Sequence, residues 1–199
     1  MADYTAIADV GETLITLLRD NMSDLIPSPD SIVLLSPADV EDQSIRLTLF
    51  LYSVIENPHL KNQEMRNISP TQLGYPPLTL DLYYLLTAYA STAIPDRTER
   101  TLEEHRILGR AMRIFYDNTI LGGTILKGSL AGTDEEIRVV FNPMSLDDVN
   151  KIWTTFQELP YRLSVSYLVT PVRVDSIRSV STQRVASKEM NHFYMIPKK

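Results

Sequence analysis

Three kinds of residue in this chain could take part in chemistry: histidines, clustered carboxylates and a glycine-rich segment that contains a lysine. The histidines are His59, His105 and His192. His105 stands next to carboxylates, at Glu103 and Glu104, but adjacent positions on a helix do not face each other. We therefore interpret His105 as a packed helix residue and not as a general base.

Carboxylates cluster at residues 134–136 and again at Asp147 and Asp148. Paired carboxylates can serve as a general acid and base or bind a cation. The first cluster is predicted to be a hairpin tip, and the second the first turn of a helix, where the helix dipole favours negative charge. Neither cluster has the spacing of a calcium-binding loop. We predict no metal site.

Residues 122–132, GGTILKGSLAG, combine glycines with Lys127, a composition that could hold a phosphate. The segment matches neither GxxxxGK[ST] nor GxGxxG, and the chain contains no GxSxG, no HExxH and no cysteine. We therefore predict no catalytic residue, no cofactor and no enzymatic activity. The less favoured alternative is a small-molecule-binding or nucleotide-binding enzyme that uses this segment.

The composition of the 199 residues, 44% hydrophobic and 22% charged, is that of a soluble globular domain. The first residues, MADYTAIADVGETL, do not form a secretory signal, and no apolar run approaches the roughly 20 residues that cross a bilayer. We expect the chain to be made and folded in the cytoplasm, without direct membrane insertion.

The formal net charge of −6 is unevenly distributed. Residues 172–199 carry six basic and two acidic side chains, a net charge of +4, which leaves −10 on the rest. An acidic body argues against a nucleic-acid-binding face, which is normally basic. The basic tail could lie on a neighbouring copy or on another acidic protein. The alternative is a solvated tail.

Helices are expected near residues 4, 100 and 145. Apolar residues recur at spacings of three and four in each. Thr101 with Glu104, and Ser145 with Asp148, have the spacing of a capping box at a helix start.

Strands are expected near residues 31, 44, 77, 137 and 160. The segment PPLTLDLYYLLTAYA, residues 76–90, has a period of two and is predicted to be a central strand that begins half exposed and ends buried. Its YLLT echoes YLVT at residues 167–170, which we interpret as two central strands sharing a pattern. The polar residues 56–77 are predicted to be a long loop.

These elements predict an α+β fold, a mainly antiparallel mixed sheet with about three packing helices. We predict a globular domain at residues 1–171 and a C-terminal arm at residues 172–199 that makes contacts between subunits. The strand order does not follow from the sequence.

Three segments together resemble a known family: TLFLYSVIENPHLKNQ, PPLTLDLYYLLTAYA and EEHRILGRAM. They are similar to the N-terminal domain of the cap, or tail-terminator, proteins of extracellular contractile injection systems. The antifeeding prophage and the Photorhabdus virulence cassette are examples of these phage-tail-like particles. The resemblance covers about residues 4–170.

The resemblance implies a structural cap protein with a tail-terminator-like fold. Such proteins form a ring, expected to be a hexamer, that ends the inner tube and the contractile sheath. The implied partners are other copies of the chain, the sheath protein and the inner tube protein, with no nucleic acid. The implied location is the bacterial cytoplasm during assembly and then the particle, either released or membrane-associated. An alternative is a baseplate or sheath adaptor subunit of the same particle.

The C-terminal tail holds the residues that we predict to bind a partner. They combine an apolar cluster with two basic side chains: Phe193, Tyr194, Met195, Ile196, Arg184 and Lys188. The tail could add a strand to the edge of a sheath subunit, with main-chain hydrogen bonds supplying affinity. The alternative is that the cluster folds back on its own body.

Overall fold

The computed structural model describes residues 3–156 and 159–182. The chain divides into two compact units. Unit 1 comprises residues 1–62 and 77–175, and unit 2 comprises residues 63–76 and 176–199. The last long strand of unit 1 continues past the predicted boundary at residue 171 to Val174. That domain boundary stays a prediction.

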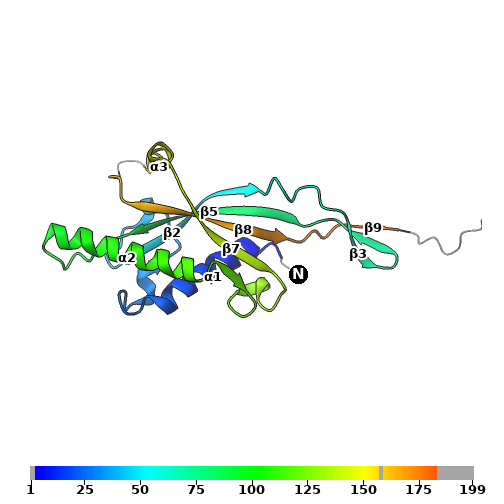
Figure 1. The fold of residues 1–199 in the computed structure, drawn as a ribbon, viewed down its shortest axis with the longest axis horizontal. Helices are drawn as coiled ribbons and strands as arrows, with labels where there is room; N and C mark the ends of the chain where they lie inside the picture. Colours follow the sequence, from blue (N-terminus) through cyan, green and yellow to red (C-terminus); the bar gives the residue numbers. More distant parts are fainter. Residues whose placement is uncertain (1–2, 157–158, 183–199) are drawn as a thin grey trace, which may run out of the picture. The chain divides into compact units, whose positions relative to one another are not determined.

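Unit 1 is built on a six-stranded sheet in the order β1-β2-β5-β8-β7-β6 (Figure 1). Its strands are β1 (Ile32–Val33), β2 (Leu47–Glu56), β5 (Leu78–Ala88), β6 (Ile120–Gly122), β7 (Glu136–Asn142) and β8 (Ser164–Val174). β1 runs parallel to β2, and the other neighbours are antiparallel. The predicted α+β class, with a mixed and mainly antiparallel sheet, is confirmed.

The centre of the sheet is β5, as its period of two predicts. Leu82, Tyr84 and Leu86 face the main core, whereas Leu85 faces the opposite side. Leu78 at the start of the strand is 48% exposed, so the predicted change from half exposed to buried is correct. The echoed tyrosines meet directly, because Tyr84 pairs with Tyr167 of β8.

Helices α1 (Ala6–Asn21) and α2 (Arg97–Asp117) cover one face of the sheet (Figure 1). Leu14 and Leu18 of α1 and Phe115 of α2 pack into the main core, and the Phe115 ring meets the Tyr167 ring edge-on at 4.9 Å. Each buried side chain of this size contributes about 1.5–3 kcal/mol relative to exposure. These buried contacts between the helices and the sheet therefore stabilise unit 1.

The start of α2 differs from the prediction. Its N-cap is Asp96, whose carboxylate accepts a hydrogen bond from the Glu99 N–H at 2.7 Å. Thr101 lies inside the first turns and donates its hydroxyl to the Arg97 carbonyl at 3.1 Å. The capping-box spacing at Thr101 was misleading because a threonine hydroxyl also bonds to the backbone within a helix.

The opposite face of the sheet carries the short helix α3 (Leu146–Trp153). Ser145 caps α3 as predicted, accepting from the Asp148 N–H at 3.2 Å. Val149 and Trp153 of the helix form a small buried cluster with Phe156 and with Leu85 of β5. The hydroxyls of Tyr52 and Ser166 meet 2.9 Å apart between β2 and β8, so this face combines apolar and hydrogen-bonded contacts.

Unit 2 is a three-stranded antiparallel sheet in the order β3-β4-β9. Its strands are β3 (Arg66–Ser69), β4 (Gln72–Gly74) and β9 (Ser179–Ser181). The polar segment predicted as one long loop therefore contains a hairpin, and that prediction was wrong for residues 66–74. The Arg178 guanidinium stacks over the Tyr75 ring, 4.4 Å from its centroid.

Three short 3-10 helices complete the described elements: η1 (Pro29–Ser31), η2 (Pro37–Asp39) and η3 (Gly128–Leu130). Among the described residues, the search for helices long and apolar enough to cross a membrane finds none.

Candidate functional site

The glycine-rich segment folds around a carboxylate of its own chain. The Asp9 carboxylate of α1 accepts hydrogen bonds from the Ser129 N–H at 2.9 Å, the Ser129 hydroxyl at 2.6 Å and the Thr5 hydroxyl at 2.9 Å. Gly128 has φ +59°, and a Cβ built there would lie 2.1 Å from Asp9 Oδ1. Glycine is thus required both by the backbone conformation and by the approach of Asp9.

The hydrogen bonds of Asp9 decide whether the glycine-rich segment can hold a phosphate. Burial raises the pKa of Asp9, but the hydrogen bonds from Ser129 and Thr5 outweigh that effect and hold the pKa below its usual range. The Lys127 N–H donates to the Thr13 hydroxyl at 3.0 Å. Because these donors already have partners within the chain, the segment offers no ready cradle, and the nucleotide-binding alternative loses its main support.

The two carboxylate clusters also have structural roles. Glu135 accepts from Arg173 at 2.7 Å. Hydrogen bonds from Ser145 and Lys151 lower the pKa of Asp148 in the first turn of α3. Across residues 3–156 and 159–182, no group of three or more metal-ligating side chains is found.

The histidines do not form a site in the described part of the chain. His105 is exposed on α2, so the prediction that it packs is wrong: its position on the helix points away from the stripe that faces the sheet. His59 is exposed after β2. His192 lies outside the described residues.

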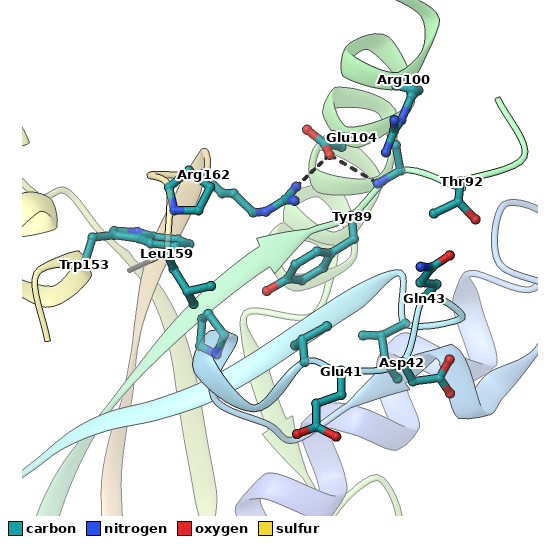
Figure 2. A pocket seen from close by; sticks show the side chains of 15 residues that line it. Glu41, Asp42, Gln43, Tyr89, Thr92, Arg100, Glu104, Trp153, Leu159 and Arg162 are labelled. Atoms are coloured by element: carbon teal, nitrogen blue, oxygen red, sulfur yellow. Dashed lines mark hydrogen bonds and ion pairs between the residues drawn. The ribbon is translucent and has the colours of Figure 1, made fainter. Parts of the chain in front are cut away.

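Unit 1 contains a cavity of about 210 Å³, and Figure 2 shows the side chains that line it. Arg162 spans it, bonded to Glu104 at 3.1 Å and lying over the Tyr89 ring, 4.9 Å from its centroid. The Glu104 carboxylate also accepts from the Ala90 N–H at 3.2 Å. Glu104 therefore links α2 to the segment just after β5 and to Arg162.

Two buried polar atoms of the cavity wall are weak candidates for chemistry. The indole N–H of Trp153 and the hydroxyl of Tyr89 bond to no atom of the described residues. Burial raises the pKa of the Tyr89 hydroxyl, with a smaller opposing effect of the nearby Thr48 hydroxyl. A phenol with a raised pKa stays protonated at neutral pH, so it supplies no base. In the cavity wall, Arg162 thus contacts both Glu104 and Tyr89.

A different kind of surface lies at the edge of the sheet. β1 pairs only with Leu47 and Thr48, so within the described residues the following part of β2, Leu49–Glu56, has a strand on one side only. Val54 and Ile55 on this open edge are 45% and 49% exposed. Unpaired N–H and C=O groups beside apolar side chains are a template for pairing with another strand.

A groove of about 440 Å³ borders the beginning of this open edge. We call it the β2 groove. Its walls come from α1, from the segment after β1 and from β2 and β5, and one charged residue, Asp39, contributes to them: Ile7, Ala8, Gly11, Leu34, Leu35, Ser36, Asp39, Leu49, Phe50, Leu51 and Tyr84. Leu34 is 47% exposed there. Most of the lining is apolar, which suits a hydrophobic side chain of a partner.

The residues predicted to bind a partner, Phe193, Tyr194, Met195, Ile196, Arg184 and Lys188, lie outside the described residues. Their contact stays a prediction. Neither the open edge of β2 nor the bond network of Asp9 was predicted, because each depends on which distant segments become neighbours. The apolar alternation of β2 was the one available signal, and it does not reveal which side of the strand stays unpaired.

Solved structures with similar folds include two proteins of injection particles. The first is the sheath/tube terminator, in the extended state, of the extracellular contractile injection system PVC. The two chains share 19% identity with a TM-score of 0.66, over 98% of this chain and 66% of that one. The second is the tube-terminating cap of the anti-feeding prophage, with 16% identity and a TM-score of 0.52, over 86% of this chain and 59% of that one. This chain thus spans about six tenths to two thirds of the length of each.

No curated protein matches the chain. The family model of the Pvc16 N-terminal domain matches residues 9–188, nearly the whole chain. The match agrees with the resemblance found in three segments of the sequence and includes all the described strands. The chain belongs to the Pvc16 N-terminal domain family.

Proposed function

We propose that the protein is a structural cap that ends the inner tube and the contractile sheath of a phage-tail-like injection particle. The observation that carries this proposal is the likeness of its fold to a sheath/tube terminator over 98% of the chain. Membership of the Pvc16 N-terminal domain family supports the same role.

The surfaces of the described residues support assembly more than catalysis. Unit 1 presents an open strand edge and an apolar groove, while Glu135, Asp148 and the glycine-rich segment are engaged in internal bonds. An extended main-chain edge is a common means of joining protein subunits. In this proposal the chain acts without enzymatic activity and without a cofactor.

The proposal also includes the oligomer, its partners and the place of assembly. Copies of the chain form a closed ring, a hexamer, which contacts the sheath protein and the inner tube protein. The ring assembles in the bacterial cytoplasm and then forms part of the particle. A heterologous contact repeated around an axis is the general route to such a ring.

Labelled particles test the role. In a host that produces the particles, the chain carries an affinity tag for gold labelling, and negative-stain electron microscopy locates the gold. We expect gold at the end away from the baseplate, and particles of uncontrolled length when the chain is absent. Gold at the baseplate would instead support a baseplate adaptor, and gold along the sheath would support a sheath adaptor.

We propose further that Arg184, Lys188, Phe193, Tyr194, Met195 and Ile196 bind a partner in the capped particle. The test replaces Tyr194 with Ser and counts capped particles. Tyr116→Ser is the matched control, since Tyr116 is 81% exposed on α2. We expect fewer capped particles with Tyr194→Ser alone. Equal counts for both variants would contradict the contact.

A further inference from the structure

The open edge of β2 leaves hydrogen-bonding capacity unused among the described residues. β2 has 10 residues, and β1 covers only Leu47 and Thr48 on the outer side. The chain turns away after Val33 and forms η2, so β1 cannot continue along β2. An edge of this length, with no proline in it, has room for an added strand of several residues.

The chemistry beside the edge defines what could occupy it. The β2 groove is lined by apolar side chains from four parts of unit 1, including the half-exposed Leu34. Its charged wall residue, Asp39, begins a short acidic run with Glu41 and Asp42. A fitting occupant would be an extended segment with large apolar side chains and basic residues near them.

The C-terminal segment of the same chain has this composition. Residues 184–199 contain the apolar run Phe193–Ile196, and four basic residues stand with it: Arg184, Lys188, Lys198 and Lys199. Unit 1 as a whole carries 13 basic and 23 acidic residues, so its net charge of −10 attracts such a segment.

We propose that residues 184–199 of one copy add a strand to the open edge of β2 in a second copy, with the apolar run in the β2 groove. This inference rests on the proposed function. In a closed ring, each copy binds one neighbour through one surface and the other neighbour through a different surface. A tail donated to the next copy is a heterologous contact of that kind. The acceptor surface for the tail is then the open edge of β2 together with the β2 groove.

Disulfide trapping in the full-length chain tests the proposal. The natural chain has no cysteine, so every disulfide that forms joins introduced residues, and the size tag separates the heterodimer from the two homodimers. One copy carries Ser53→Cys on the open edge and a size tag, and the other carries Ser187→Cys or Asn191→Cys in the tail. Paired strands bring facing Cβ atoms within about 5.5 Å, which permits a disulfide. We expect a covalent heterodimer that reducing agent dissolves.

The matched control replaces Ser53→Cys with Thr154→Cys, an exposed residue just after α3. Because a docked tail raises the effective concentration of its thiol, we expect about tenfold more heterodimer at position 53 than at 154. Equal yields would overturn the proposal. A single chain that carries both Ser53→Cys and Ser187→Cys, and that closes only an internal disulfide, would place a copy's own tail in the groove and also overturn it.

A second pair of variants tests the groove itself. Leu34→Glu places a charge in the β2 groove, while Leu146→Glu makes the same change at a residue of α3 that is 67% exposed. Both are expected to fold, with melting temperatures within about 3 °C of the parent. Heterodimer yield should fall about tenfold for Leu34→Glu alone. No difference between the two would count against the groove as the acceptor.

These results separate the inference from the proposed function. If gold labelling places the chain at the capped end but no cross-link forms at position 53, the cap role stands and this contact fails. If the cross-link forms but gold marks another part of the particle, the contact stands and the cap role fails.

Discussion

Unit 1 contains a mainly antiparallel sheet and unit 2 an antiparallel one, but among the described residues only unit 1 surrounds its sheet with a core. Helices cover both faces of the unit 1 sheet, and its middle strands are almost fully buried. In the described residues of unit 2, Gly74 alone is buried, and its strands are three or four residues long. Short sheets without a buried apolar face are marginal in isolation.

The two units also differ in net charge. Unit 1 has a net charge of −10, whereas unit 2 has six basic and two acidic residues, a net charge of +4. We propose that unit 1 holds the fold and offers the open edge of β2, and that unit 2 supplies the basic tail that meets another molecule. The predictions below test this division, starting with the largest effect.

Removing a core side chain should separate the two units most clearly. Leu82 is 0% exposed, so Leu82→Ala should lower the free energy of unfolding by about 2–5 kcal/mol, since it loses apolar contacts and leaves a cavity. Ile68 in unit 2 is 56% exposed, and Ile68→Ala should cost about 0.5 kcal/mol or less. Urea denaturation measures both. A comparable loss at Ile68 would show that unit 2 has a core of its own.

The Asp9 network should have the next largest effect. Asp9→Asn leaves donors of Ser129 and Thr5 without a carboxylate and should cost about 1–3 kcal/mol at neutral pH. Asp134→Asn, at an exposed carboxylate, should change the free energy of unfolding by no more than about 0.5 kcal/mol. Similar losses in the two variants would refute the structural role of Asp9.

The pH dependence of stability gives the same network a second test. The folded-state pKa of Asp9 lies below its ordinary value, so its carboxylate contributes stability that is fully present above about pH 4. That contribution is lost as the pH falls through the lowered pKa. Urea denaturation between about pH 5 and pH 2 should therefore show a shallower acid dependence for Asp9→Asn than for the parent chain.

Helix capping in unit 1 should have a smaller effect. Asp96→Ala removes the acceptor of the Glu99 N–H and should cost about 1 kcal/mol. Thr101→Ala, at the position where the sequence predicts the cap, should change stability by no more than about 0.5 kcal/mol. If Thr101→Ala proved the more damaging change, the helix start seen here would be wrong.

The smallest effect is expected in unit 2. Arg178→Gln removes the stacking on Tyr75, an exposed cation–π contact worth about 0.5–1 kcal/mol. Because unit 2 is expected to open locally, the loss should appear as about two- to fivefold faster amide hydrogen exchange in Gln72–Gly74, with little change in global unfolding. A global loss as large as that of Leu82→Ala would contradict the division between the units.

The parts of the fold that the sequence predicted are those with a strong local period. The alternation in residues 78–88 predicted β5, and Ser145 with Asp148 predicted the start of α3. The hairpin of β3 and β4 was missed because strands of four and three residues show too little alternation. Their third strand, β9, lies about a hundred residues away in the chain, and no local pattern indicates that pairing.

The candidate surfaces were less predictable for the same physical reason. Lys127 and its glycines were recognised as an anion-binding composition, but the anion is Asp9, 120 residues from Ser129. The open edge of β2 exists because β1 stops after two residues, which is a property of the strand order. A sequence period shows which side chains face a core, and it does not show which backbone edges stay free.

The bond between Asp9 and the glycine-rich loop has a consequence for how the protein responds to the cell. A free phosphate or nucleotide that competes for the Ser129 N–H must displace a carboxylate tethered to the same chain, which never diffuses away. Asp9 therefore occupies the position at Ser129 that a free anion would take, so unit 1 should keep its shape when the phosphate concentration changes.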